Sequence, residues 1–160
     1  MTTIGNLIGN KADSLVRSTL SIGDVHLLPL GREESITAKD GASFRNKFLV
    51  ILGFDNQGNA VGGVVINSNI NNNLPSSITD YLMPVTVNQC PFLQYNSFVN
   101  CSHLIVVKKE KFNSNTYKGS IKDKEIMDMI IGTLCESPYA NKQQLLEFGI
   151  IQKANKEKEA

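Results

Sequence analysis

Two segments of the chain carry residue types that recognise a phosphate group. Arg45 and Lys47 open an apolar stretch with strand-like alternation. Asn67 and Ser68 end the next such stretch, and the turn DNQGN between the two stretches favours a hairpin. Residues far from a hairpin turn oppose one another on its two strands. We therefore expect these four side chains to lie together.

A guanidinium group beside a hydroxyl and an amide suits a phosphodiester. Arginine forms two parallel hydrogen bonds to phosphate oxygens and stabilises the charge that develops on them. The alternative is that Arg45 is a solvent-exposed residue at a strand end and that Ser68 begins a loop.

A second group of reactive side chains is Cys101-Ser102-His103. In a strand, Cys101 and His103 project from one face, which permits a nucleophile and its base. The more ordinary interpretation is a buried cysteine beside a half-exposed histidine. His26 and His103 have no second ligand at metal-binding spacing, so no metal site is expected. The chain has no phosphate-loop, dinucleotide-binding or serine-hydrolase motif, and no cofactor is expected.

The elements that position these residues are mostly strands, followed by helices. Alternating or continuous apolar residues predict strands in segments 23–30, 44–55, 60–69, 83–88 and 97–112. Gly62 and Gly63 predict a bulge or a close backbone approach. Helical spacing predicts a helix over 122–137, and a second helix runs from a cap at Asn141 to a stop at Gly149.

This order predicts a mainly β fold with C-terminal helices, built as a small β-barrel or a strongly bent sheet. Residues 1–20 are expected to form an N-terminal arm or short helix. Residues 21–137 are expected to form the β-barrel domain with a closing helix, and residues 138–160 a C-terminal helix and polar tail.

The composition limits the classes of partner. The chain has 160 residues, 41% of them apolar, and its 16 basic and 15 acidic residues give a net charge of +1. This balance argues against a nucleic-acid binder held by charge alone, although it permits a local basic patch. With no tryptophan and 7% aromatic residues, the chain has little material for a base-stacking platform. Widely spaced cysteines and the lack of a long apolar run predict a cytoplasmic protein with reduced thiols and no membrane association.

Five short segments occur in the chain in an order that resembles the pattern of one protein family. They are Gly23-Asp24-Val25, Arg45-Asn46-Lys47-Phe48-Leu49-Val50-Ile51-Leu52, Val64-Val65-Ile66-Asn67-Ser68-Asn69, Ser97-Phe98-Val99 and Lys118-Gly119-Ser120-Ile121. Over about residues 23–135 the chain resembles the MazF/PemK-type toxins of toxin–antitoxin pairs. That family has a Gly-Asp strand, an Arg leading an apolar strand, a strand ending in Thr or Ser, a Ser-x-Val strand and a Lys-Gly turn before a helix.

The resemblance implies an SH3-like barrel of the MazF/PemK/CcdB type. It also implies a metal-independent endoribonuclease that cleaves single-stranded RNA by attack of the ribose 2′-hydroxyl on the adjacent phosphate. It assigns Arg45 to charge stabilisation and Ser68 to holding the phosphate. Strand geometry adds Lys47, Asn67 and Asn69 as RNA-binding residues. The family works as a homodimer that an antitoxin protein neutralises, so both partners are expected here.

The chain also departs from the family pattern. A proline commonly follows the catalytic arginine, whereas Asn46 stands here, and an aspartate is common near the position of Ser102 or His103. These departures favour a second hypothesis, a non-catalytic SH3-like barrel that binds a protein segment or nucleic acid in its groove.

Overall fold

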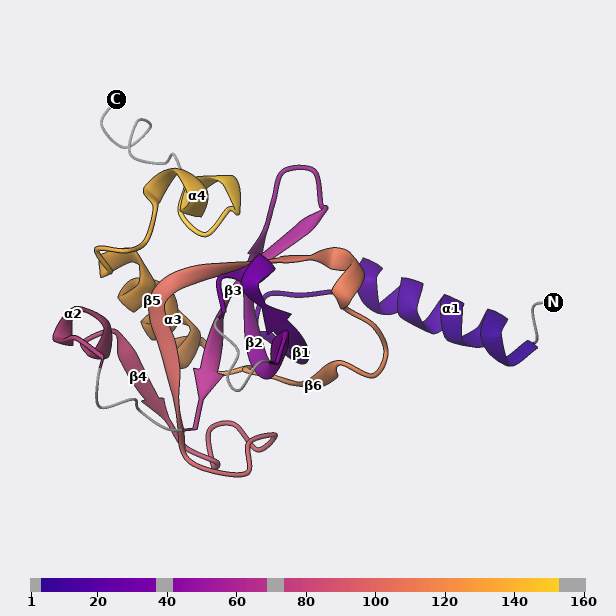
Figure 1. Cartoon of the computed structure of the whole chain (residues 1–160), viewed down its shortest axis with the longest axis horizontal. Coiled ribbons are helices and arrows are strands. Elements are labelled where there is room, and N and C mark those ends of the chain that lie inside the picture. The colour runs from indigo at the N-terminus through magenta and orange to yellow at the C-terminus, as the bar shows by residue number, and fades with distance from the viewer. Residues whose placement is uncertain (1–3, 37–41, 69–73, 153–160) are drawn as a thin grey trace.

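The computed structural model describes residues 4–36, 42–68 and 74–152. In these residues six strands form one antiparallel sheet in the order β4-β5-β3-β2-β1-β6, with β4 and β6 at its two edges. The strands are β1 (Asp24–Gly31), β2 (Phe44–Phe54), β3 (Ala60–Asn67), β4 (Leu82–Val85), β5 (Ser97–Lys108) and β6 (Tyr117–Ser120). The prediction of a mainly β fold is confirmed (Figure 1).

The helices of the described chain are α1 (Ile4–Ser18), η1 (Arg32–Glu34), α2 (Ser76–Thr79), η2 (Lys109–Lys111), α3 (Lys124–Glu136) and α4 (Lys142–Glu147). Of these, α3 and α4 begin at a residue whose side chain caps the helix. Asn141 caps α4 as predicted, because its side-chain oxygen accepts a hydrogen bond from the Gln144 amide at 3.2 Å. Gly149 follows with a φ of 71°, which confirms the predicted stop.

Both faces of the sheet are buried, and each face has its own apolar core. Because strand residues alternate between faces, Val50 and Leu52 of β2 enter the core under α3, and Leu49 and Ile51 enter the second core. The second core includes Phe112, which is fully buried. The central hairpin of β2 and β3 is therefore held from both sides, which makes it a rigid support for side chains at its ends.

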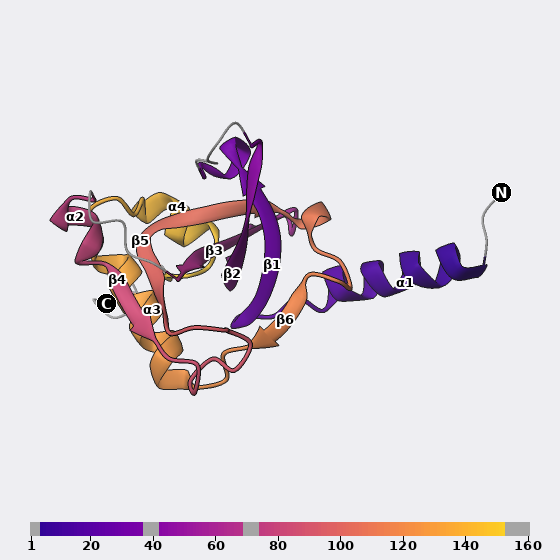
Figure 2. The same cartoon turned by 60° about the horizontal axis from the view of Figure 1, so that its bottom comes forward.

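A sharp bend in β5 allows one strand to serve both cores. On β3, Gly63 pairs with Ile105 while Val65 pairs with Asn100, so the intervening part of β5 bulges out of the ladder. Figure 2 shows β5 turning near its middle. As a result, Cys101 belongs to the core under α3, and Ile105 belongs to the second core.

The segment after α4 docks on the same hairpin through glycines. A Cβ atom at Gly53 would lie 2.1 Å from the carbonyl oxygen of Phe148, and one at Gly62 would lie 2.9 Å from the Phe148 ring. The Phe54 amide donates to that Phe148 carbonyl at 3.1 Å. The predicted close backbone approach is confirmed at Gly63, where a Cβ atom would lie 2.3 Å from the Val50 carbonyl oxygen. The C-terminal helix packs on the sheet.

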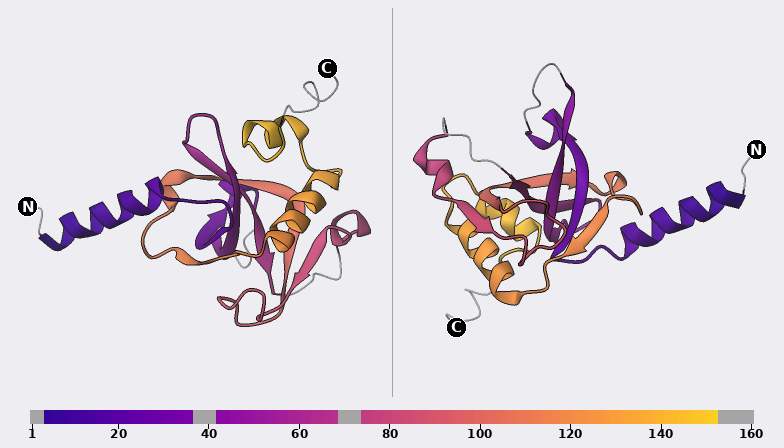
Figure 3. Two further views of the ribbon diagram at one scale, coloured as in Figure 1. Left: turned by 180° about the vertical axis from the view of Figure 1, so that it is seen from behind. Right: turned by 90° about the horizontal axis from the view of Figure 1, so that it is seen from below.

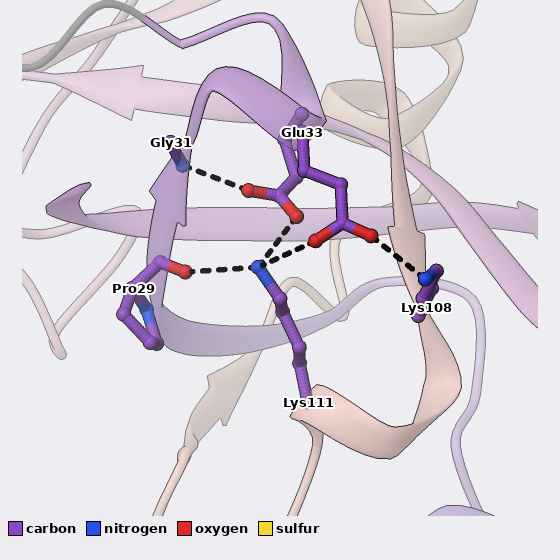
Figure 4. A network of polar contacts seen from close by, with 6 residues as sticks. Pro29, Gly31, Glu33, Lys108 and Lys111 are labelled. Carbon is purple, nitrogen blue, oxygen red and sulfur yellow. Dashed lines mark hydrogen bonds and ion pairs between the residues drawn. The ribbon is translucent and has the colours of Figure 1, made fainter. Parts of the chain in front are cut away.

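A buried carboxylate of η1, directly after β1, binds a lysine of η2, directly after β5 (Figure 4). Glu34 accepts hydrogen bonds from the Gly31 amide at 2.7 Å and from Lys111 Nζ at 2.5 Å. Its side chain is 1% exposed, whereas the neighbouring ion pair of Glu33 with Lys108 lies in solvent. Because β1 pairs with β2, this network also steadies the end of β2 that carries Arg45.

Helix α1 projects from the rest of the molecule in every view (Figures 1 and 3). Its C-terminal part is tied down by Asp13, which accepts bonds from the amide and hydroxyl of Ser114, each at 2.9 Å. Arg17 adds a bond from its Nε to the Phe112 carbonyl at 2.9 Å. Within the described residues, no helix has the length and apolar character needed to cross a membrane.

Candidate functional site

A cavity of about 420 Å³ lies at the end of the central hairpin farthest from its turn. Its walls come from residues 45–48 of β2, residues 66–68 at the end of β3, Leu27 of β1, residues 92–95 of the loop before β5, and Ser97. Chain segments far apart in sequence therefore meet around one space, which lies open to solvent.

Four of the five predicted site residues line this cavity: Arg45, Lys47, Asn67 and Ser68. The hairpin brings them together because β2 and β3 pair with Phe48 opposite Ile66. Arg45, Lys47 and Asn67 are half-buried, and Ser68 is exposed just beyond β3. Asn69, the fifth, lies outside the described residues.

The polar wall of the cavity contains a direct contact between the two strands. Lys47 Nζ donates a hydrogen bond to the side-chain oxygen of Asn67. Strand alternation places Arg45, Lys47 and Asn67 on one face of the hairpin and Phe48 and Ile66, which join the core under α3, on the other. The cationic side chains therefore belong to the opposite face of the hairpin from the core under α3, and residues of both faces line the cavity at the strand ends.

Part of the lining is aromatic, and sequence reasoning missed it. Phe92 packs against Phe48 with ring centroids 5.7 Å apart, and Gln94 and Tyr95 follow at the rim. These residues lie in a loop with neither motif nor periodicity, and the low aromatic content pointed away from a stacking surface. Composition counts aromatic residues over the whole chain, so it carries no information about their gathering at one place.

The lining defines what the cavity can do chemically. Of the described residues that line it, Arg45, Lys47 and Tyr95 have ionisable side chains, and the others supply amide, hydroxyl and apolar groups. Arginine and lysine provide positive charge and hydrogen-bond donors for a phosphate. The described lining contains no carboxylate and no imidazole, so its groups for proton transfer are the arginine, lysine and tyrosine side chains and solvent.

The second predicted group, Cys101 and His103, is not arranged for catalysis. Cys101 is fully buried, its thiol donates to the Val99 carbonyl, and burial raises the pKa of the thiol to about 12. His103 is exposed instead; its Nδ1 lies 2.8 Å from the Ser102 hydroxyl, and its ring stacks on Tyr139. The expectation that both project from one face of a strand is wrong, because β5 leaves regular pairing between Asn100 and Ile105.

His26 is a buried structural histidine in the second core. Its Nδ1 lies 2.8 Å from the Thr116 hydroxyl, and its ring meets Phe112 and Tyr117 edge-on. Burial lowers the pKa of this imidazole, although the negative charge of Asp24 opposes the shift. Within the described chain, its Nε2 has no hydrogen-bond partner, so protonation there would place an unpaired charge in the core.

The fold and this cavity define a mainly β protein with a cationic and aromatic cavity at the end of its central hairpin. No model of a known protein family matches the chain, and no match is found among curated proteins.

Proposed function

We propose that the protein is a toxin-like, metal-independent endoribonuclease that cleaves single-stranded RNA in the cavity at the end of the β2–β3 hairpin. The observation that carries the proposal is the meeting of Arg45, Lys47, Asn67 and Ser68 around one open space. The residue order of the MazF/PemK-type toxins led to the same two segments. The finer fold that goes with this proposal is an SH3-like barrel, and the bent sheet with a core on each face is compatible with it.

In this proposal, the 2′-hydroxyl oxygen of one nucleotide attacks its own 3′-phosphate. The new bond joins that oxygen to phosphorus, the bond to the 5′-oxygen of the next nucleotide breaks, and a cyclic phosphate and a 5′-hydroxyl result. Arg45 stabilises the charge that builds on the phosphate oxygens, and Ser68 donates a hydrogen bond to the phosphate. The 2′-hydroxyl proton leaves to solvent, and solvent protonates the 5′-oxygen.

The same proposal includes the partners and place of action that the resemblance implies. The protein would act in the cytoplasm as a homodimer, with RNA lying along a groove that an antitoxin segment fills in the inhibited state. The open cavity, lined by cations and by aromatic rings, suits either an RNA strand or an acidic segment with apolar anchors.

The deciding experiment incubates a long single-stranded RNA in EDTA with the wild-type protein, with Arg45→Ala and with Arg32→Ala. Arg32 is an exposed arginine on η1 that does not line the cavity, so it controls for the loss of one positive charge. Loss of one transition-state donor typically costs about 3 to 4 kcal/mol, so Arg45→Ala should cleave at least 100-fold more slowly. Newly formed 5′-hydroxyl ends report the reaction. A fall below tenfold in folded Arg45→Ala contradicts the assignment.

The alternative function is a non-catalytic module that binds nucleic acid or a protein segment. It is favoured by the described lining, which offers cations and rings but neither a carboxylate nor an imidazole as a base. This alternative predicts RNA or peptide binding without RNA cleavage by folded wild-type protein, and no toxicity when the protein is expressed.

A further inference from the structure

The loop between β4 and β5 forms part of the lining of the same cavity. It contributes Phe92, Gln94 and Tyr95, while the strand ends contribute Arg45 and Lys47. A phosphate held by the cations would therefore have aromatic surface within the same cavity of about 420 Å³. This is the combination that single-strand binders use, namely charge for the backbone and rings for the bases.

Hydrogen bonds and burial hold this loop in one conformation. The Thr86 amide donates a hydrogen bond to the Gln89 side-chain oxygen at 2.9 Å, and the Gln89 amide donates one to the Thr86 hydroxyl oxygen at 3.2 Å. The Val87 amide donates to the Asn96 side chain at 3.0 Å, which ties the two ends of the loop together. Cys90 and Leu93 are buried in the core under α3. The loop is thus a formed surface before any ligand arrives.

Tyr95 lies in this hydrogen-bonded loop, and its side chain is exposed to solvent. Its side chain is 67% exposed, while its carbonyl oxygen accepts a bond from the Ser97 hydroxyl at 2.8 Å. Phe92 already packs on Phe48, whereas within the described chain no aromatic ring packs on the ring of Tyr95. A fixed backbone with an open ring face costs little entropy when a ligand stacks on it.

Resting on the proposed function, we infer that Tyr95 is a stacking platform for one unpaired nucleobase of the RNA whose phosphate lies at Arg45. The adjacent amide of Gln94, exposed at the same rim, can both donate to and accept from the edge of that base. Tyr95 then supplies affinity with little sequence preference, and Gln94 supplies discrimination between bases. The two cations in the same lining favour RNA over an uncharged peptide as the occupant.

The test measures affinity for a short single-stranded RNA by fluorescence anisotropy at constant salt. The RNA carries 2′-O-methyl groups, so it cannot be cleaved, and its binding is separated from catalysis. Tyr95→Ala should weaken binding about tenfold or more, while Tyr95→Phe, which keeps the ring, should bind like wild type. Tyr139→Ala removes an exposed tyrosine that does not line the cavity and should leave affinity unchanged.

A second arm uses the same RNA with single abasic positions. One abasic position should weaken binding to the wild type but cause no further loss with Tyr95→Ala, because the stacking partner is already absent. Wild-type affinity in folded Tyr95→Ala, or an equal loss in Tyr95→Phe, overturns the inference while leaving the proposed function intact. If the wild type neither binds nor cleaves RNA and takes up only a protein segment, the proposed function and this inference fall together.

Discussion

Lys47 on β2 and Asn67 on β3 are joined by a hydrogen bond from the ammonium group to the side-chain oxygen. The contact crosses the hairpin at the cavity, so it places a positive charge at a defined point of the lining. An ammonium group supplies positive charge and hydrogen-bond donors to an anion. The pair therefore helps define the electrostatic character of the cavity.

Replacing Lys47 with methionine should reduce the salt dependence of RNA binding. A lysine that contacts a phosphate releases a counterion, and for single strands each such contact contributes about 0.7 to the slope of log affinity against log salt concentration. We expect Lys47→Met to bind more weakly at low salt and to lower the slope by that amount. Lys142→Met changes the charge equally at an exposed position of α4 that does not line the cavity, and it should leave the slope unaltered. An unchanged slope in Lys47→Met would remove Lys47 from the phosphate contacts.

Breaking the buried pair of Glu34 and Lys111 should destabilise the fold more than breaking its exposed neighbour. Lys111→Met leaves the carboxylate of Glu34, 1% exposed, without its cation. Loss of one partner of a fully buried ion pair lowers the free energy of unfolding by about 3 to 5 kcal/mol. Because the Lys111 side chain is 27% exposed and therefore partly screened by solvent, we expect a loss of about 2 kcal/mol. Lys108→Met, which removes the exposed partner of Glu33, should leave the urea midpoint unchanged. Equal midpoints for the two variants would contradict a structural role for Glu34.

Stability should fall on mild acidification because of the histidines. Burial lowers the pKa of His26 and of His103 below the ordinary value of 6.5. Below pH 6.5 the unfolded imidazoles gain protons that the folded ones resist, so the free energy of unfolding decreases as pH falls. We expect a lower urea midpoint at pH 5 than at pH 7.5, and a smaller difference in His26→Gln. An undiminished difference in that variant would assign the effect to other groups.

Two glycine-to-alanine changes should have opposite effects on stability. Gly53→Ala drives a methyl group against the Phe148 carbonyl, 2.1 Å away, and should displace the segment after α4 from the sheet. Gly132 lies inside α3 with open space around it, so Gly132→Ala should stabilise the protein by about 0.5 to 1 kcal/mol through helix propensity. Thermal melts of both variants provide the comparison. A neutral Gly53→Ala would show that the docking of Phe148 does not contribute to stability.

Local signals account for the parts of the molecule that sequence reasoning predicted. The alternation of apolar residues in β2 and β3, with a short turn between them, was enough to place Arg45, Lys47, Asn67 and Ser68 at one end of a hairpin. Asn141 and Gly149 likewise marked the two ends of α4. Each of these features depends on residues close together in sequence, whose hydrogen bonds and dihedral preferences act over a few positions.

The remaining features were decided by contacts between distant segments. The bulge that separates Cys101 from His103 arises where β5 has to pass from one core to the other. Tyr95 reaches the cavity because side-chain hydrogen bonds fold its loop toward the hairpin. The sequence by itself thus determined the strands, the caps and the cationic part of the cavity lining. Only the tertiary structure decided that aromatic residues join this lining and that Cys101 is buried. The physical reason is that burial and long-range pairing depend on which surfaces meet, and no local pattern specifies that.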